Sequence, residues 1–297
     1  MEIKKSLEQL PQRGLNILIY GDPGIGKTTL ANTAPKPLVL DFDNGYHRAS
    51  LTGDHVTYKS WGDVARDKQD IYKALQTDYE TLVIDTVGTG IDLMQAHIIA
   101  TNPAMRTKTL QMWGETKQTA NDFFNPLKTM GKNVVYIAHA KVKEEGDIRR
   151  VMPLISGSTY DNILQTCDLV GYYTTTNNKH VLTFDLTDNV VAKNCAGILP
   201  RVLPNVMDMR NVLTDIIAET KQTLLDRASN QEQYFAIIDK WNAEASKTKE
   251  PNALVEAMAN AGLSNEVKRS VWVAIVNTLN KRGFEWDSET KQFNKVK

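Results

Sequence analysis

The eight residues from Gly21 to Thr28 have the types and spacing of a loop that binds phosphate. They run Gly-Asp-Pro-Gly-Ile-Gly-Lys-Thr: a glycine, four residues, then Gly-Lys-Thr. Glycines let backbone N–H groups turn toward a phosphate chain without a Cβ in the way. The lysine of such a loop contacts the β- and γ-phosphates, and the next hydroxyl holds Mg²⁺. The predicted nucleotide-binding residues are Gly21, Asp22, Pro23, Gly24, Ile25, Gly26, Lys27, Thr28 and Thr29.

The residues on either side of this loop predict the elements that position it. The apolar run 15–20 is typical of a buried strand, and residues 27–32 are typical of the start of a helix. Strand, glycine-rich loop and helix are the context that this motif requires. The helix start adds free N–H donors and the positive end of a helix dipole beside the phosphates.

Further short apolar runs alternate with helical patterns up to about residue 195. Continuous apolar strands of this kind suit a parallel sheet covered by helices on both faces, which predicts an α/β fold. The predicted strands are 15–20, 37–43, 81–85 and 133–139, and the predicted helices are 61–79, 90–100 and 109–130.

Three aspartates follow the apolar runs, at the strand ends where open α/β sheets bind their ligands. Asp85 is predicted to hold Mg²⁺ with Thr28, the alternative being that it caps the next turn. Many P-loop ATPases have a catalytic glutamate directly after this aspartate. Here that position is Thr86, so a catalytic carboxylate must come from elsewhere. Asp41 and Asp43 are the candidates, and we prefer Asp43 because it lies nearer the mouth of the site. The alternative is that both cap a turn.

Two stretches beyond the strand ends carry basic residues that suit phosphate contacts. His139 ends the fourth strand and is placed to contact a γ-phosphate. We expect a long loop without secondary structure from Lys141 to about residue 159. Basic side chains neutralise phosphates and aromatic rings stack on bases, so both stretches are candidates for binding single-stranded DNA. For the stretch that contains Arg106 and Lys108, the alternative is a solvated loop with a core tryptophan. The candidate DNA-binding residues are Arg106, Lys108, Lys141, Lys143, Arg149 and Arg150.

The pattern changes after residue 167. Segments 168–173 and 180–184 predict two strands joined by a polar turn, with one more strand at 190–193. Prolines 200 and 204 then mark a boundary, and only helices are predicted from about residue 206. We therefore divide the chain into a core at 1–205 and a helical C-terminal region at 206–297.

Composition bounds the classes of protein that the chain can belong to. Of its 297 residues, 41% are apolar and 24% are charged, with 35 Lys plus Arg against 35 Asp plus Glu. The balanced charge predicts no partner, so a nucleic-acid surface would have to be local. Two cysteines make neither a disulfide framework nor a zinc site. No apolar run suggests a membrane span or a secretory signal, so we expect a cytoplasmic protein.

Together these segments resemble the core of RecA-type recombinases, and most closely the minimal RecA-like ATPases of bacteriophages that are grouped with single-strand annealing proteins. The resemblance implies a RecA-like P-loop NTPase core with a mostly parallel central sheet sandwiched by helices, followed by a C-terminal helical region. It also implies ATP and Mg²⁺ as cofactors, and a bacterial host cytoplasm if the chain is phage-encoded. The matching segments are 16–31, 37–43, 82–86, 134–139 and 167–172.

The resemblance also implies individual roles. Asp43 takes the place of the family's catalytic carboxylate, which is usually glutamate, and His139 takes the place of a γ-phosphate sensor that is usually glutamine. The DNA-binding loops fall near 100–112 and 141–158. Lys193 is the candidate for a cation that reaches the nucleotide of a neighbouring subunit, which implies a homo-oligomer with nucleotide at the subunit interface. A single-strand-binding protein or another replication protein is a candidate partner.

These observations predict a DNA-stimulated ATPase that binds single-stranded DNA and assists phage recombination or annealing. The first alternative is an AAA+-like helicase loader or remodeller. Its usual glutamate after Asp85 is absent here, and the β-rich stretch 168–193 also argues against it. The second alternative is a nucleotide-gated binding module with negligible turnover, with which the shorter Asp43 side chain is compatible.

Overall fold

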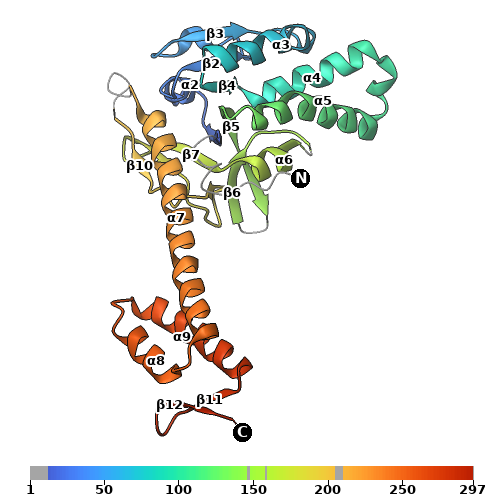
Figure 1. Cartoon of the computed structure of the whole chain (residues 1–297). Coiled ribbons are helices and arrows are strands. Elements are labelled where there is room, and N and C mark those ends of the chain that lie inside the picture. Colours follow the sequence, from blue (N-terminus) through green and yellow to red (C-terminus); the bar gives the residue numbers. More distant parts are fainter. Residues whose placement is uncertain (1–12, 146–147, 158, 205–209, 297) are drawn as a thin grey trace. The chain divides into compact units, whose positions relative to one another are not determined.

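The computed structural model describes residues 13–145, 148–157, 159–204 and 210–296. The chain forms two compact units that divide at Thr223 and Leu224. We describe each unit separately (Figure 1).

The first unit is built on one mixed sheet whose central strands are parallel. Its order is β10-β8-β7-β1-β5-β4-β2-β3, and the six strands from β7 to β3 run parallel. The antiparallel pairs are β7 with β8, β8 with β10, β7 with β9 and β5 with β6. The strands are β1 Asn16–Gly21, β2 Pro37–Asp41, β3 Asp54–Thr57, β4 Thr81–Asp85, β5 Asn133–Glu145, β6 Ile148–Pro153, β7 Leu169–Thr176, β8 Lys179–Thr183, β9 Lys193–Asn194 and β10 Arg201–Val202.

Helices cover both faces of this sheet because successive strand residues point to opposite sides. In β1, Leu18 and Tyr20 face a core shared with α3, α4, α5 and α6, whereas Ile17 and Ile19 face a core shared with α2 and the start of α7. The mostly parallel α/β fold predicted from the sequence is confirmed. The helices are α2 Lys27–Ala31, α3 Trp61–Thr77, α4 Val87–Thr101, α5 Thr109–Thr129, α6 Thr159–Thr166 and α7 Val212–Lys247, with the short 3₁₀ turns η2 Tyr46–Arg48 and η3 Pro103–Arg106.

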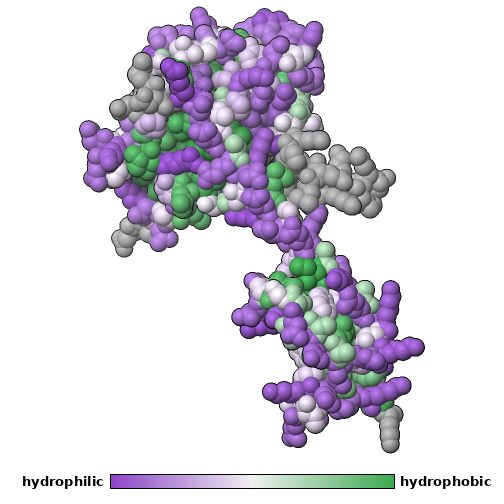
Figure 2. Space-filling view, turned by 60° about the vertical axis from the view of Figure 1, so that its left-hand side comes forward, coloured by the Kyte–Doolittle hydropathy of each residue, from purple (hydrophilic) through white to green (hydrophobic). Residues whose placement is uncertain are grey.

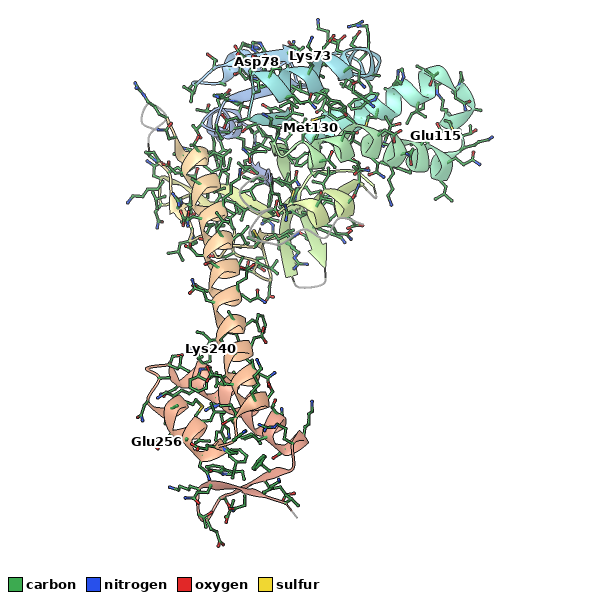
Figure 3. The ribbon with its side chains drawn as sticks, viewed as in Figure 1. Lys73, Asp78, Glu115, Met130, Lys240 and Glu256 are labelled. Carbon is green, nitrogen blue, oxygen red and sulfur yellow. The ribbon has the colours of Figure 1, made fainter. Side chains whose placement is uncertain are left out.

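The outer faces of the covering helices are polar. Lys73 of α3 and Glu115 of α5 are exposed and extend from the outside of their helices (Figure 3). Figure 2 shows hydrophilic residues over most of the face in view. No helix in the described part of the chain is both long enough and apolar enough to cross a bilayer.

Segment 141–159 differs from its predicted form. Instead of a loop, it holds the end of β5, the antiparallel strand β6 and the start of α6. The β5–β6 hairpin extends beyond the sheet (Figure 1). Strand β6, Ile-Arg-Arg-Val-Met-Pro, lacks the alternation of apolar and polar residues that marks a half-buried strand, so periodicity missed it. The short edge strand β3 was missed as well, and its first three residues are exposed.

The β7–β8 hairpin, in contrast, was predicted correctly. Asn177 and Asn178 form its turn with φ angles of 50° and 60°. Asparagine tolerates this left-handed conformation better than most residues, and a two-residue turn of this kind matches the twist of the strands.

The second unit is a small helical body closed by a β-hairpin. It contains the end of α7, α8 Pro251–Ala259, α9 Asn265–Lys281, β11 Phe284–Asp287 and β12 Gln292–Lys295. Val271, Ile275 and Leu279 of α9 are fully buried, and their spacing of four residues places them on one face of the helix. The side chain of Ser264 caps α9 by accepting a hydrogen bond from the N–H of Val267.

The hairpin β11–β12 was not predicted, because only helices were expected after residue 206. Trp286 and Phe293 are directly opposite each other in it, with ring centroids 5.1 Å apart. Trp272 of α9 lies edge-on to Trp286 at 4.6 Å. This aromatic cluster fixes the hairpin to α9.

The division between the units lies inside α7, whereas the prolines had suggested one near residue 206. The reason is packing. Leu213, Ile216 and Ile217, in the first two turns of α7, belong to the core of the first unit. Thr214 donates a hydrogen bond from its hydroxyl to the carbonyl of Thr33 at 2.7 Å, which ties the start of α7 to the segment after α2.

Candidate nucleotide-binding site

The predicted phosphate-binding loop lies between β1 and α2, at the carboxyl end of the sheet. Gly24 and Gly26 adopt φ angles of 77° and 100°, which other residues rarely adopt. The ammonium of Lys27 donates to the carbonyls of Gly21 and Asp22 at 3.0 and 2.7 Å. Burial lowers the pKa of Lys27. The loop carbonyls thus hold the buried lysine beside the site where phosphate is expected.

A cavity of about 250 Å³ opens beside this loop. Of the predicted nucleotide-binding residues, Pro23, Gly24, Gly26, Lys27, Thr28 and Thr29 line it. Gly21 and Asp22 contribute through the carbonyls that hold Lys27, and Ile25 packs against the hydrophobic core. The other lining residues are Asp41, Asp43, Gly45, Arg48, Ala49, Asp85, Thr86 and His139.

Thr28 and Asp85 meet inside this cavity. The Thr28 hydroxyl donates to Oδ2 of Asp85 at 2.6 Å. Burial raises the pKa of Asp85 to about 6, although the hydrogen bond from Thr28 opposes the shift. Hydroxyl and carboxylate oxygens are the ligands that Mg²⁺ prefers, and a cation would also offset the cost of the buried carboxylate. The residues present therefore fit a magnesium ion held between Thr28, Asp85 and a nucleotide.

Asp41 and Asp43 differ in what their carboxylates contact: Asp41 bonds to the backbone of the following turn, whereas Asp43 lines the cavity. The Asp41 carboxylate is buried and accepts hydrogen bonds from the N–H groups of Gly45 and Tyr46, both at 3.1 Å. It therefore caps the turn after β2. Asp43 is partly exposed and lines the cavity, where its Oδ1 accepts a hydrogen bond from the Thr86 hydroxyl at 3.3 Å. Asp43 remains available to hold a water molecule.

His139 lies next to Asp43, because β5 and the turn after β2 end at the same edge of the sheet. Its Nε2 is 3.6 Å from Oδ2 of Asp43. Its Nδ1 is buried without a hydrogen-bond partner in the described structure. The structure thus brings Lys27, Asp43, Asp85 and His139 together around one cavity, as their predicted roles require.

Lys193 lies elsewhere. It is in β9 and pairs with Val170, near the start of β7, whereas the phosphate-binding loop is level with Tyr173 farther along that strand. Its ammonium donates to the carbonyl of Gln165 at 2.9 Å. Lys193 does not line the cavity of its own chain. Its role toward a neighbouring subunit stays a prediction.

The basic candidates fall into two groups. Lys141, Lys143, Arg149 and Arg150 are on the β5–β6 hairpin, and Lys143 is directly opposite Arg150 in its register. Arg106 ends η3 and Lys108 precedes α5, between the helices α4 and α5; both are exposed. The structure therefore does not gather the six residues on one element.

Sequence reasoning missed three cavity residues that follow Asp43: Gly45, Arg48 and Ala49. It treated this segment only as a turn. A signal was available, because a basic residue that follows an acidic strand end so closely is placed to reach a bound phosphate. It also missed Thr86 as the hydrogen-bond donor to Asp43.

The sheet, the phosphate-binding loop and the meeting of Thr28 with Asp85 define a P-loop NTPase site. A family model described as an AAA domain matches residues 13–196, which is more than half of the chain. The chain belongs to this AAA domain family.

Two individual proteins resemble parts of the chain. The SPbeta prophage-derived uncharacterized protein YorG of Bacillus subtilis (strain 168) is 27% identical over 159 residues, which cover 49% of each protein. The chain thus spans about half the length of that relative. The KaiC-like protein PH0186 of the archaeon Pyrococcus horikoshii OT3 is 14% identical, with a TM-score of 0.34 over 57% of this chain and 77% of that one. That likeness is too distant to indicate a function.

Proposed function

We propose that this P-loop protein is an ATPase whose turnover is stimulated by single-stranded DNA and that assists recombination or annealing. The observation that carries the proposal is the path of β5. The strand passes the cavity at His139 and continues directly into the basic β5–β6 hairpin. One continuous strand thus runs from the expected γ-phosphate position to the candidate nucleic-acid surface.

Hydrolysis would use the cavity residues in distinct roles. Lys27 would neutralise charge on the β- and γ-phosphates. A magnesium ion on Thr28 and Asp85 would supply further positive charge to the same oxygens. Asp43 would orient the attacking water and accept its proton as the oxygen bonds to the γ-phosphorus and ADP leaves. His139 would contact the γ-phosphate and lose that contact after its release.

The hairpin carries the basic residues Lys141, Lys143, Arg149 and Arg150, with Glu144 directly opposite Arg149 in its register. Lys143 and Arg150 are directly opposite each other, so the hairpin places two cations side by side. Nε of Arg150 is buried without a hydrogen-bond partner in the described structure. Phosphate groups of a nucleic acid are suitable partners for both side chains.

An aromatic ring lies beside these cations. Tyr160, at the start of α6, has the ammonium of Lys141 6.0 Å from its ring centroid. Aromatic rings next to backbone-binding cations are the usual platform for stacking the bases of single strands. Tyr160 is thus an additional candidate, although the sequence pattern did not single it out.

A second contact connects the hairpin with the phosphate-binding loop. The hydroxyl of Tyr20, in β1, lies 3.3 Å from the carbonyl of Val151 in β6 and donates to the carbonyl of Val191 at 2.7 Å. Tyr20 directly precedes the loop. Movement of the hairpin on DNA binding would therefore act on β1 as well as on β5, which would couple DNA binding to turnover.

The double variant Lys141→Ala/Arg150→Ala is expected to weaken binding of a single-stranded oligonucleotide about tenfold at low salt. The slope of log affinity against log salt should fall by about 1.4, because each lost phosphate contact removes about 0.7. Fluorescence anisotropy with a labelled oligothymidine measures both quantities. Lys59→Ala/Lys73→Ala removes the same charge from exposed positions outside the hairpin. Equal salt slopes for the two double variants would refute the proposed interface.

Membership of the AAA domain family also suits the second candidate function, a protein remodeller or helicase loader. That candidate predicts ATP binding and turnover without stimulation by DNA. Its turnover would instead respond to a protein partner.

A further inference from the structure

We propose that Arg48 contacts the terminal phosphate of the nucleotide bound to its own chain and stabilises the charge that develops there during hydrolysis. This inference rests on the proposed ATPase function and adds a catalytic residue to it. A cation that stabilises the phosphates had been expected only from Lys193 of a neighbouring subunit. In this proposal the chain that binds the nucleotide supplies one itself.

Arg48 reaches the cavity from the segment after β2. It lines the cavity together with Asp43, Asp85 and His139, the residues expected around the γ-phosphate and its magnesium ion. Within the described part of the chain, no carboxylate forms an ion pair with Arg48. A cation that lines an acidic pocket without pairing to its carboxylates remains available for an anion that enters.

The backbone that carries Arg48 is held at both ends. Before it, the Asp41 carboxylate accepts the N–H groups of Gly45 and Tyr46. After it, the N–H of Ser50 donates to the hydroxyl of Thr29, in the helix that follows the phosphate-binding loop, at 3.2 Å. By capping this turn, Asp41 fixes the position of η2 and therefore of Arg48.

The Tyr46 side chain adds a third attachment. Its hydroxyl donates to Oδ1 of Asn32 at 2.7 Å and accepts from the N–H of Gly53. Asn32 follows α2 directly, so the segment is bonded to the phosphate-binding element at two positions. Such anchoring reduces the entropy lost when a side chain orders on its ligand.

The guanidinium of Arg48 is close to the backbone of Gly45. A Cβ added to Gly45 would collide with Nη2 of Arg48. Any larger residue at position 45 would therefore displace the guanidinium, which offers a way to move Arg48 without removing it. The backbone of Gly45 has a φ angle of −114°, which alanine adopts readily.

Chemistry favours the terminal phosphate over the others. The phosphate-binding loop supplies its own donors to the inner phosphates. Arg48 shares its segment with Asp43, which is expected to hold the attacking water, so the two side chains approach the same end of the nucleotide. A planar guanidinium can donate to two phosphate oxygens at once.

The test compares binding of fluorescent ATP and ADP analogues with steady-state turnover for Arg48→Ala, Arg48→Lys and the neighbouring exposed control His47→Ala. Arg48→Ala should weaken ATP binding about tenfold with ADP binding unchanged, and should lower kcat about 100-fold. Arg48→Lys should recover part of both losses, because lysine restores the positive charge but not the planar guanidinium that donates to two oxygens at once. His47→Ala should behave as wild type.

Gly45→Ala provides an independent check on position. It should show the same selective loss of ATP affinity, and the double variant Gly45→Ala/Arg48→Ala should be no worse than Arg48→Ala alone. An Arg48→Ala protein with the kcat and the ATP-to-ADP affinity ratio of His47→Ala would overturn the proposal while leaving the ATPase function intact. Failure of the wild type to bind either nucleotide would instead overturn the ATPase function itself.

Discussion

Replacing Asp43 with asparagine is expected to slow ATP hydrolysis about 1,000-fold while ATP affinity stays within a few-fold of wild type. Asparagine can still accept the hydrogen bond from Thr86 that Asp43 accepts at 3.3 Å, so the local structure should persist. It cannot take a proton from water. Steady-state phosphate release and equilibrium binding of a fluorescent ATP analogue separate the two effects.

The variant Asp43→Glu is the matched control for this prediction. It keeps the carboxylate and extends it by one methylene, toward the glutamate that RecA-type proteins usually have. We expect turnover at or above the wild-type rate. If Asp43→Asn hydrolyses ATP as fast as wild type, the general base is elsewhere, and the partly exposed Asp43 serves only to bond Thr86.

Replacing Asp85 with asparagine is expected to stabilise the nucleotide-free protein and to abolish magnesium-dependent nucleotide binding. The buried carboxyl has a pKa of about 6, compared with an ordinary value of 3.8. Keeping it ionised at pH 8 therefore costs on the order of 3 kcal/mol, of which asparagine should recover about 1–3 kcal/mol. Asparagine can also accept the hydrogen bond from Thr28.

The pH dependence of this gain has a definite sign. Between about pH 4 and pH 6 the folded protein keeps the Asp85 proton that the unfolded chain loses, so the wild-type free energy of unfolding falls as pH rises through this window. The stabilisation by Asp85→Asn should be largest above pH 6 and shrink toward pH 4. Urea unfolding at pH 4.5, 6 and 8, with Asp41→Asn beside it, measures the trend. Asp41 accepts two backbone hydrogen bonds, so its replacement should destabilise. A loss of stability in Asp85→Asn at pH 8 would contradict the account.

The sequence allowed the central strands and the phosphate-binding loop to be predicted, because they obey local rules. The apolar run 81–85 is β4, and residues 61–79 contain α3 nearly from end to end. Gly24 and Gly26 adopt the backbone angles for which glycine is required. In these segments burial, backbone conformation and ligand chemistry all constrain the same few residues.

The elements that were missed depend on long-range packing or on exposed surface. Strand β6 reads Ile-Arg-Arg-Val-Met-Pro, which has no period of two, and its pairing with β5 is visible only in the three-dimensional structure. The β11–β12 hairpin depends on the contact between Trp286 and Trp272, which is fourteen residues earlier in the sequence. The start of α7 belongs to the first unit because of Ile216 and its neighbours, which no local pattern distinguishes from the rest of that helix.

The site was predictable only in part, for the same reason. Lys27, Thr28 and Asp85 follow from a motif and a strand end. Asp41 caps the following turn and Asp43 does not. Which of the two carboxylates reaches the N–H groups of that turn depends on the folded backbone and cannot be seen in the sequence. Arg48 lines the cavity from a segment that hydrogen bonds to Asp41 and Thr29 hold in place, and these bonds cannot be seen in the sequence.

Steady-state ATP hydrolysis by the wild-type protein, with and without single-stranded DNA, tests the central claim most directly. Lys27→Ala serves as the control because it removes the ammonium that the phosphate-binding loop holds in place. The account predicts clear stimulation by DNA in the wild type and no hydrolysis above background in Lys27→Ala. Hydrolysis that is abolished in Lys27→Ala but indifferent to DNA in the wild type would contradict the DNA-coupled function and favour the remodeller or loader.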